Sequence, residues 1–325
     1  MPSILIITNR FDPHVDFMVE RFNAAGHPFI RFNTDDFPRP TSLSVSCGRD
    51  GGYVTILREA GRIVHEQNIG AVWHRRPGEF PAEGLDAESR RFARQEMREL
   101  VRGWWSLLSS HKWVSDPFAI DRARHKVLQL QLAGALGFRL PRTLITTDPD
   151  EFRSFWDSCD GVVVYKPLGL AVSWDEEDRY HFTPTRLLDQ SFLERVEGIK
   201  AAPCIFQEYV QKKFELRITV IERRVFSCAI HSQDSSESKI DWRLHSDVGK
   251  LRHAVYDLPA PIEHRCIDLV ARLGLRSGMI DMVVTPEEEH VFLEVNPNGQ
   301  WLWVEEMTGL PISDGLVAAL TSSGT

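Results

Sequence analysis

The sequence predicts an α/β protein that opens with a parallel sheet, and its first strands and helix carry this prediction. Ser3–Thr8 is a short apolar run suited to a strand that is buried on both faces. Apolar residues within Val15–Phe22 then recur at helical spacing, and Gly26 follows as a stop signal. Phe29–Phe32 returns to the strand pattern. This β-α-β order is typical of parallel sheets, and helix and strand patterns keep alternating farther along the chain.

Short strands and a long helix complete the first unit. Glycine-containing turns separate the three strands of a predicted antiparallel meander, which are Leu43–Cys47, Tyr53–Leu57 and Arg62–Val64. Another strand, Ala71–Trp73, and a helix within Asp86–Ser110 follow. We expect this unit to end at residue 115.

The middle of the chain alternates helices with strands as well. A helix is expected from Asp121 to Leu136, and Asp148-Pro149-Asp150-Glu151 has the residues of a helix start. Val162–Lys166 is predicted to be a buried strand that ends in a lysine. Gly169–Thr185 is polar and mixed, and we predict a mobile hairpin or lid there.

A second series of strands fills the last third of the chain. The predicted elements are the strands Cys204–Val210, Glu215–Glu222 and Val225–His231, a helix near Ile262–Leu273, and the strands Ser277–Val284 and His290–Val295. The second and third strands are expected to form a hairpin about Arg223-Arg224, followed by the polar loop Ser232–Lys239. We therefore divide the chain into an N-terminal unit (1–115), a central unit (116–205) and a C-terminal unit (206–325).

Length, charge and cysteine content narrow the class of protein. The 325 residues are enough for two or three domains. The formal net charge of -8, from 46 acidic and 38 basic residues, gives no overall reason to expect a nucleic-acid partner. Five dispersed cysteines without a CxxC pair indicate reduced thiols in the cytoplasm. The sequence shows neither a signal peptide nor an apolar run of membrane-spanning length, so we expect no membrane partner.

Three oxygen-bearing side chains near the end of the chain predict a metal site. Asp281 lies in one predicted strand, and Glu294 and Asn296 lie in the next, beyond a short turn. Glu294 and Asn296 are two residues apart, so their side chains point to one face. Carboxylates among aliphatic residues are unfavourable to bury without a cation, and two carboxylates with one amide oxygen suit Mg²⁺. The alternative is a strand edge whose acids face solvent.

Three basic residues are candidates for contacts with a triphosphate. Lys166 follows four apolar residues at the end of a buried strand, which sets it apart from ordinary surface lysines. Lys126 lies on the helix expected at Asp121–Leu136, and alone it cannot be distinguished from a solvated surface charge. Arg217 lies on the strand that follows Val210.

The segment Gln207–Val210 and the later Glu215 are candidates for nucleoside contacts. An apolar strand interrupted by Gln-Glu can pair its backbone with the edge of adenine, and a carboxylate can accept hydrogen bonds from ribose hydroxyls. Ordinary strand residues with outward-facing acids explain the same pattern equally well.

Taken in order, these pieces resemble the ATP-grasp superfamily from about residue 116 to the end of the chain. The ordered motifs are Lys126, Tyr165-Lys166-Pro167, Gln207-Glu208-Tyr209-Val210, Glu215-Leu216-Arg217, Asp281 and Glu294-Val295-Asn296-Pro297. The resemblance implies an α/β ATP-grasp fold with an N-terminal α/β pre-ATP-grasp domain. It also implies that Lys126 and Lys166 hold the phosphates of ATP, that Gln207–Val210 is the adenine hinge, and that Glu215 holds ribose. In the same family pattern, Arg217 contacts the transferred phosphoryl group, and Asp281, Glu294 and Asn296 carry Mg²⁺.

A narrower resemblance covers nearly the whole chain. The sequence is similar to the microviridin-type maturases, or graspetide synthetases, in the motifs Ile6-Ile7-Thr8-Asn9-Arg10, Asp12, Arg31-Phe32-Asn33-Thr34-Asp35-Asp36, Trp73-His74-Arg75-Arg76-Pro77, Asp241-Trp242-Arg243, Asn296-Pro297-Asn298-Gly299-Gln300-Trp301 and Thr308-Gly309-Leu310-Pro311. These enzymes form ester or amide links between side chains of a ribosomal precursor peptide. Two departures are His74, where a tyrosine is expected, and the acidic stretch Ser173–His181, which alters the expected lid.

The narrower resemblance implies an ATP-dependent, ADP-forming macrocyclase and a precursor peptide with leader and core as its partner. Arg217 and Mg²⁺ would neutralise charge on the transferred phosphoryl group. Arg243 is the candidate for holding the acceptor carboxylate, because an arginine fork matches that group; the alternative is a surface arginine beside Trp242. Asp241 either orients Arg243 or acts as a base toward the hydroxyl. The family also suggests a homodimer.

The leader of the precursor peptide requires a docking surface. We expect this surface within Glu215–Lys239, where the peptide would add a strand. Arg75 and Arg76 leave the first sheet and either face the cleft or solvate the end of a strand.

Three other functions compete with this one. An ATP-grasp ligase that adds amino acids to a protein tail or a small peptide shares every ATP residue, but the N-terminal motifs and Gln300-Trp301 favour the maturase. A non-catalytic nucleotide sensor or peptide-binding module is opposed by the intact metal trio and Lys166. A dinucleotide-binding oxidoreductase is opposed by Thr8-Asn9-Arg10, which stands where a glycine fingerprint would follow the first strand.

Overall fold

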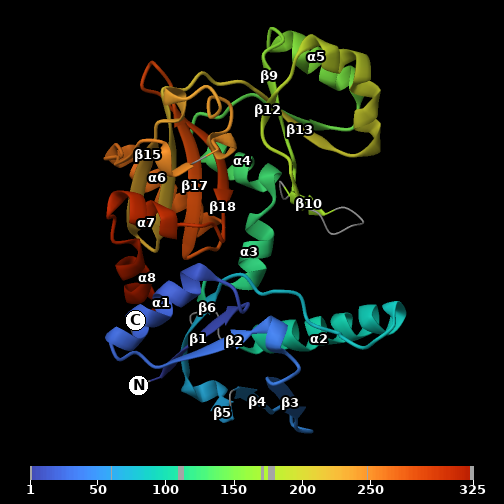
Figure 1. Cartoon of the computed structure of the whole chain (residues 1–325), viewed down its shortest axis with the longest axis vertical. Helices are drawn as coiled ribbons and strands as arrows, with labels where there is room; N and C mark the ends of the chain where they lie inside the picture. The colour runs from blue at the N-terminus through green and yellow to red at the C-terminus, as the bar shows by residue number, and fades with distance from the viewer. Residues whose placement is uncertain are drawn as a thin grey trace.

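The computed structural model describes residues 2–59, 61–108, 113–169, 172–174, 180–246 and 248–322. It contains an N-terminal unit, a C-terminal unit stacked on it, and a smaller central unit that projects beside the C-terminal one (Figure 1). No helix in these ranges combines the length and the apolar character needed to cross a membrane.

The N-terminal unit is built on a parallel sheet, as predicted. Its strands are β1 (Ser3–Thr8), β2 (Phe29–Asn33), β6 (Ile69–His74) and β7 (Trp113–Val114), in the order β2-β1-β6-β7. The remaining elements are the helices α1 (Pro13–Ala24) and α2 (Ala87–Leu107) and the meander β3 (Ser42–Cys47), β4 (Tyr53–Glu59) and β5 (Arg62–His65). Side chains of β1 alternate between two cores, with Ile4 and Ile6 on the side of α1 and Leu5 and Ile7 on the side of α2.

The single helix predicted at Asp121–Leu136 is wrong, because the chain forms two helices there. These are α3 (Pro117–Ala123) and α4 (Lys126–Ala135). His125 between them is extended, with φ -71° and ψ 109°. Neither glycine nor proline marks this break in the sequence. The break is instead stabilised by Gln129, whose Nε2 donates a 2.6 Å hydrogen bond to the last carbonyl of α3.

The central unit is an antiparallel sheet of four strands, in the order β12-β9-β13-β8. The strands are β8 (Thr143–Thr146), β9 (Val163–Lys166), β12 (Arg186–Leu187) and β13 (Cys204–Glu208), and the helical segments are α5 (Pro149–Ser158) and a 3-10 stretch at Gln190–Ala201. Asp148 accepts a hydrogen bond from the N–H of Asp150, which confirms the predicted start of α5.

The predicted lid contains a hairpin of two short strands. These are β10 (Val172–Trp174) and β11 (Tyr180–Phe182), which pair antiparallel. The middle of the acidic stretch that distinguishes this lid, residues 175–179, lies outside the described residues.

The C-terminal unit is an antiparallel sheet of five strands, in the order β16-β15-β14-β17-β18. Its elements are β14 (Phe214–Ile221), β15 (Arg224–Ile230), β16 (His253–Val255), β17 (Ser277–Val284), β18 (His290–Asn296) and the helices α6 (Ala260–Arg272), α7 (Leu302–Thr308) and α8 (Ile312–Thr321). The predicted hairpin of β17 and β18 around residues 285–289 is confirmed by their pairing.

One predicted detail of this sheet is wrong, and the predicted docking of the leader by strand addition within Glu215–Lys239 is contradicted along β14 only. Ile221 pairs with Arg224, so the turn of the first hairpin consists of Glu222 and Arg223 rather than Arg223 and Arg224. Strand addition along Glu215–Ile221 is excluded, because β14 is already paired with β15 on one side and with β17 on the other. A peptide strand can add only where a backbone edge is unpaired.

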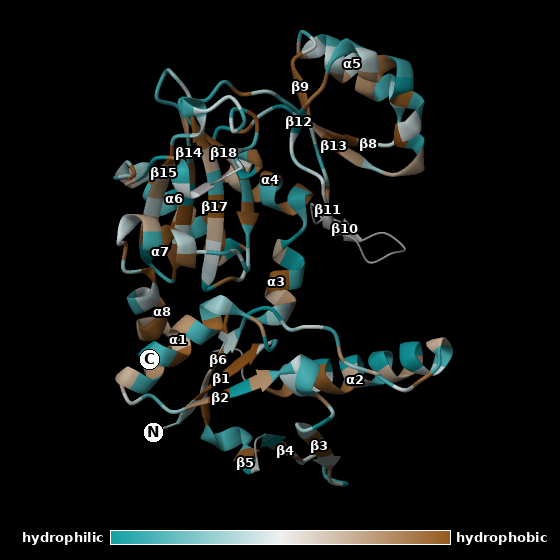
Figure 2. Ribbon diagram, in the orientation of Figure 1, coloured by the Kyte–Doolittle hydropathy of each residue, from teal (hydrophilic) through white to brown (hydrophobic). Residues whose placement is uncertain are grey.

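A shared hydrophobic core joins the N-terminal and C-terminal units. Val15, Met18 and Phe22 of α1 pack in one cluster with Leu316 and Leu320 of α8. Figure 2 shows hydrophobic colour along strands of both sheets, including β1, β6, β17 and β18. The opposite face of the C-terminal sheet packs against α3, α4 and α6. The division of the chain into units at residues 115 and 205 stays a prediction. The second boundary falls inside β13, which continues across residue 205.

Candidate active site

A cavity of about 270 Å³ lies between the C-terminal sheet and the central sheet. Every residue assigned from the sequence to ATP, metal or catalysis lines it, namely Lys126, Lys166, Gln207, Glu208, Tyr209, Val210, Glu215, Arg217, Asp241, Arg243, Asp281, Glu294 and Asn296. The structure therefore gathers residues from α4, β9, β13, β14, β17 and β18 into one place. Their individual roles stay predictions.

Alternation along the strands aims the polar side chains at this cavity. Leu216 and Ile218 point into the core beneath the sheet, whereas Arg217 between them lines the cavity. Arg217 pairs in register with Asp281, and Asp281 pairs with Glu294 on the next strand. Three neighbouring strands thus present one basic and two acidic side chains at the same level.

Asp281, Glu294 and Asn296 form a compact group of potential metal ligands. Nδ2 of Asn296 donates to Oδ2 of Asp281 at 2.9 Å and to Oε1 of Glu294 at 3.3 Å. Turning the amide over would bring its oxygen to the same point, so that two carboxylates and one amide oxygen converge. This all-oxygen set fits Mg²⁺, which keeps its remaining positions for water and phosphate oxygens.

Ion pairs tie these carboxylates to the predicted phosphate contacts. Burial raises the pKa of Asp281, and the nearby Glu294 adds to that rise against the opposing charge of Arg217, whose Nη1 lies 3.0 Å from Oδ1 of Asp281. Burial also disfavours the charged form of Glu294, but its ion pair with Lys126 and the charges of Lys166 and Arg243 together outweigh that effect and lower the pKa of Glu294. The predicted metal ligands and phosphate-binding cations therefore form one charged row.

Three lysines contribute positive charge to the cavity. Lys126 is the first residue of α4, where the partial positive charge of the helix N-terminus adds to its own. Burial lowers the pKa of Lys166 to about 8, with Glu294 opposing the shift. Lys212 was missed from the sequence; its Nζ donates to Glu215 at 2.8 Å and to the carbonyl of Ile240 at 2.9 Å. The adjacent Lys213 instead forms an ion pair with Glu288 at the surface. The sequence alone does not show which of the two lysines turns inward.

The predicted hinge, Gln207–Val210, uses its first two side chains to hold the central sheet together. Nε2 of Gln207 donates to the hydroxyl of Thr143 at 2.9 Å. The carboxylate of Glu208 accepts hydrogen bonds from the backbone N–H of Arg142 at 3.1 Å and from its Nε at 2.6 Å. With the side chain of Glu208 engaged in this way, we expect contacts with adenine to come from the backbone of the segment.

Asp241 and Arg243 form a bidentate pair at the mouth of the cavity. Nε and Nη2 of Arg243 each donate to a different oxygen of Asp241 at 2.8 Å. Asp241 also accepts from the backbone N–H of Thr185 at 3.1 Å, where the chain leaves the predicted lid. Burial opposes the charged form of Asp241, yet the hydrogen bonds and charge of Arg243 lower its pKa. The structure thus favours the orienting role of Asp241 over a role as a base.

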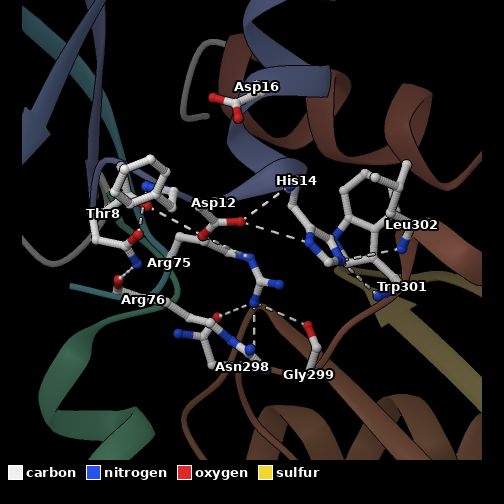
Figure 3. Close-up of polar contacts among 12 residues, drawn as sticks. Thr8, Asp12, His14, Asp16, Arg75, Arg76, Asn298, Gly299, Trp301 and Leu302 are labelled. Carbon is white, nitrogen blue, oxygen red and sulfur yellow. Dashed lines mark hydrogen bonds and ion pairs between the residues drawn. The ribbon is translucent and has the colours of Figure 1, made fainter. Parts of the chain in front are cut away.

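Three residues of the N-terminal motifs lie away from the cavity. His74 packs edge-on against Trp105 with ring centroids 5.2 Å apart, and burial lowers its pKa to about 4. The position where a tyrosine was expected therefore belongs to the core of the N-terminal unit. Arg75 neither faces the cleft nor solvates a strand end, because its side chain is buried against residues 298 and 299 (Figure 3). Arg76 is exposed.

The two sheets that face each other across a cavity of paired cations and carboxylates, behind an N-terminal α/β unit, define an ATP-grasp protein. The family model of the MvdD pre-ATP grasp domain matches residues 3–121. The structure of the Chryseobacterium gregarium RiPP-associated ATP-grasp ligase in complex with ADP and a leader and core peptide is similar with a TM-score of 0.90. That similarity has 30% sequence identity and covers 98% of this chain and 96% of the other.

Two structures from Microcystis aeruginosa MRC are similar as well. Macrocyclase MdnC bound with precursor peptide MdnA gives a TM-score of 0.85 and 31% identity over 98% of this chain and 99% of that chain. Macrocyclase MdnB gives a TM-score of 0.81 and 29% identity over 99% of both chains. No curated protein sequence gives a match. The chain belongs to the RiPP-associated ATP-grasp ligases of the microviridin type, the graspetide synthetases, and the predicted fold is confirmed.

Proposed function

We propose that this protein is an ATP-dependent macrocyclase that links side chains within a ribosomal precursor peptide. An Asp or Glu carboxylate of the peptide attacks the γ-phosphoryl group of ATP, ADP leaves, and an acyl phosphate forms. A Ser or Thr hydroxyl, or a Lys amine, of the same peptide then attacks the acyl carbon. Inorganic phosphate leaves, the nucleophile gives up its proton, and an ester or amide bond results.

The observation that carries this proposal is the charged row across the cavity. Arg217 pairs with Asp281 and Lys126 of α4 pairs with Glu294, and the two carboxylates lie at one level of adjoining strands. Phosphoryl transfer depends mainly on positioning and on neutralising charge that spreads over the transferred group. We therefore propose that Arg217 contacts that group and that Lys166 and Lys126 hold the phosphates that precede it.

Magnesium is the metal that the donor set fits. Asp281, Glu294 and Asn296 would hold it, and it would supply positive charge to the phosphate oxygens of ATP. The protein residues bind and orient the reactants around that charge. Arg243 remains the candidate for holding the acceptor carboxylate, since it lines the same cavity as Arg217 and is oriented by Asp241.

The peptide partner is supported by the related proteins. One is described in complex with a leader and core peptide, and MdnC is described with its precursor peptide.

Beyond this partner, we propose a homodimer in the cytoplasm, the compartment that the dispersed free cysteines favour. Light scattering of the purified protein tests the dimer.

Mass spectrometry of a precursor peptide tests the reaction. The peptide encoded next to this gene, with repeated Thr or Ser and Asp or Glu, is incubated with the protein, ATP and Mg²⁺. Loss of one water per link, with release of ADP, is the expected result. A mass gain of one amino acid would instead establish the alternative, a ligase that extends a protein tail or a small peptide. Peptide binding without ADP release would favour a non-catalytic module.

Substitution of one predicted metal ligand tests the assignment of the site. Asp281→Asn is expected to abolish peptide modification, because it removes a charged ligand while preserving the shape of the side chain. The thermal unfolding temperature should stay close to that of the unaltered protein. Asp268→Asn, at an exposed position on α6, is the matched control and should modify peptide normally. Full activity of Asp281→Asn would contradict the metal assignment.

A further inference from the structure

The loop that follows the predicted metal ligand Asn296 is held from the N-terminal unit. β18 ends at Asn296 and α7 begins at Leu302, so residues 297–301 form the whole connection. Two side chains from the N-terminal unit reach this loop, Arg75 directly after β6 and His14 in the first turn of α1 (Figure 3). Neither of them lines the ATP cavity.

Arg75 binds the middle of the loop. Its Nη1 donates to the carbonyl of Asn298 at 3.0 Å, to Oδ1 of Asn298 at 3.1 Å and to the carbonyl of Gly299 at 3.0 Å. The side chain is only 2% exposed, and its Nε lies 3.6 Å from Oδ2 of Asp12. Well-packed apolar residues often fill such buried places with equal or better stability than an ion pair. The buried charge is therefore better explained by the need to hold the loop in one position than by stability alone.

His14 binds the end of the same loop. Its Nε2 accepts hydrogen bonds from the backbone N–H of Trp301 at 3.2 Å and of Leu302 at 3.3 Å. These are the first amides of α7, which lack a capping side chain of their own. Nδ1 of His14 faces Oδ1 of Asp12 at 3.6 Å, so Asp12 lies between the two contacts and links them. Burial lowers the pKa of His14 to about 3, so the ring is neutral, and a proton on Nδ1 leaves Nε2 as the acceptor for both amides.

Close packing transmits the position of the loop to Asn296. A Cβ atom on Gly299 would lie 2.9 Å from Sδ of Met279, so the backbone of the loop rests directly on that side chain. Met279 is in turn the register partner of Asn296 on the neighbouring strand. A displacement of Gly299 therefore reaches the predicted ligand through one side chain and a short stretch of backbone.

We propose that Arg75 and His14 are positioning residues that hold the loop after Asn296 and thereby set the affinity of the metal site. This inference rests on the proposed metal role of Asn296. It assigns to the N-terminal unit a part in ATP use that is separate from any contact with the peptide. Groups that hold metal ligands in place from outside typically change metal affinity by about 10–100-fold when they are removed.

Binding of Mn²⁺ in the presence of ADP tests the proposal without turnover. Electron paramagnetic resonance reports free Mn²⁺, which replaces Mg²⁺ at oxygen sites. Arg75→Met is expected to weaken Mn²⁺ binding by about 10–100-fold, with ADP binding in the absence of metal unchanged. Arg75→Lys, which keeps a charged donor, should recover part of the loss.

Arg21→Ala is the matched control for loss of a contact between the same two units. Arg21 of α1 forms an ion pair with Asp314 of α8 but does not touch the loop. It should bind Mn²⁺ as the unaltered protein does. Asp281→Asn, which removes a proposed ligand, should lose Mn²⁺ binding.

The experiment distinguishes failure of the positioning role from failure of the metal assignment. Normal Mn²⁺ affinity in Arg75→Met, together with loss in Asp281→Asn, overturns the positioning role and leaves the metal site intact. Normal affinity in Asp281→Asn overturns the metal assignment and the positioning role with it. If Arg75→Met does not fold, the pair His14→Gln and His14→Met decides the question. Glutamine keeps an acceptor for the amides of α7 and should retain affinity, whereas methionine should lose it; equal affinity in both refutes the proposal.

Discussion

Lys166 is a partly buried cation whose charge depends on what occupies the cavity. Its ordinary pKa of 10.5 falls to about 8, chiefly because burial disfavours the ammonium form. Above the lowered pKa, a growing fraction of Lys166 is neutral before any nucleotide binds. Phosphate oxygens favour the ammonium form, so a bound nucleotide shifts the pKa upward again. Nucleotide affinity should therefore fall as the pH rises through about 8.

Proton uptake on nucleotide binding checks this expectation. Calorimetry of ADP binding slightly above the lowered pKa, in two buffers with different ionisation enthalpies, should show net uptake of protons. Lys166→Arg is the control, because arginine stays protonated throughout this range and should abolish the uptake. Equal proton uptake in the arginine variant would show that another group is responsible.

At the scale of elements, the break between α3 and α4 determines where Lys126 enters the cavity. Gln129 replaces the backbone contacts that a continuous helix would make. Its Nε2 donates to the carbonyls of Ala123 and Val295, and its Oε1 accepts from the N–H of Val295 at 2.9 Å. Val295 lies between two predicted metal ligands on β18. One buried side chain thus joins the start of α4 to the strand that carries Glu294 and Asn296.

Gln129→Leu should lower the free energy of unfolding by about 2–3 kcal/mol, because it leaves buried backbone groups without partners. Chemical denaturation measures this change. Gln131→Leu is the matched control, since Gln131 is exposed on the same helix and its substitution should leave stability nearly unchanged. Equal effects of the two substitutions would show that the bridge to β18 adds nothing to stability.

Elements with strong periodicity could be predicted from the sequence. The sequence did not show which of two neighbouring basic residues turns its side chain into the cavity. The hairpin of β17 and β18 was predicted because apolar residues flank Asp281 and Glu294 at strand spacing and a short turn joins the two runs. The break between α3 and α4 at His125 has no local signal in the sequence, because it depends on the hydrogen bonds of Gln129 to Ala123 and to Val295 of β18. The contact of His14 with Trp301 spans 287 residues of sequence, and no local pattern indicates it.

At the scale of the molecule, the N-terminal and C-terminal units are halves of one structure. Their common core contains α1, α7 and α8, and includes Trp73 of β6. The central unit has its own core, formed by α5 and by strands such as β13, with Phe152 fully buried in it. The molecule should therefore unfold in two cooperative parts, with the central unit separable from the rest.

Hydrogen exchange of core variants tests this division. Leu316→Ala on α8 should cost about 2–5 kcal/mol and speed exchange in β1 and β14 alike, because it opens the shared core. Phe152→Ala is the counterpart in the central unit and should speed exchange in β9 and β13 while leaving β1 protected. Faster exchange confined to the C-terminal unit in Leu316→Ala would argue against a common core.

The shared core has a consequence for engineering chimeras between relatives. Swapping the first 115 residues between relatives as a module leaves α1 packed against a foreign α8. A crossover that exchanges the N-terminal unit together with residues 297–322 keeps α1, α7 and α8 from one parent, so that only the face of the C-terminal sheet that packs against them comes from the other. It also keeps Arg75 and His14 with the loop they bind. Recombination points for this family should therefore come in pairs, one before and one after the residues of the ATP cavity in the sequence.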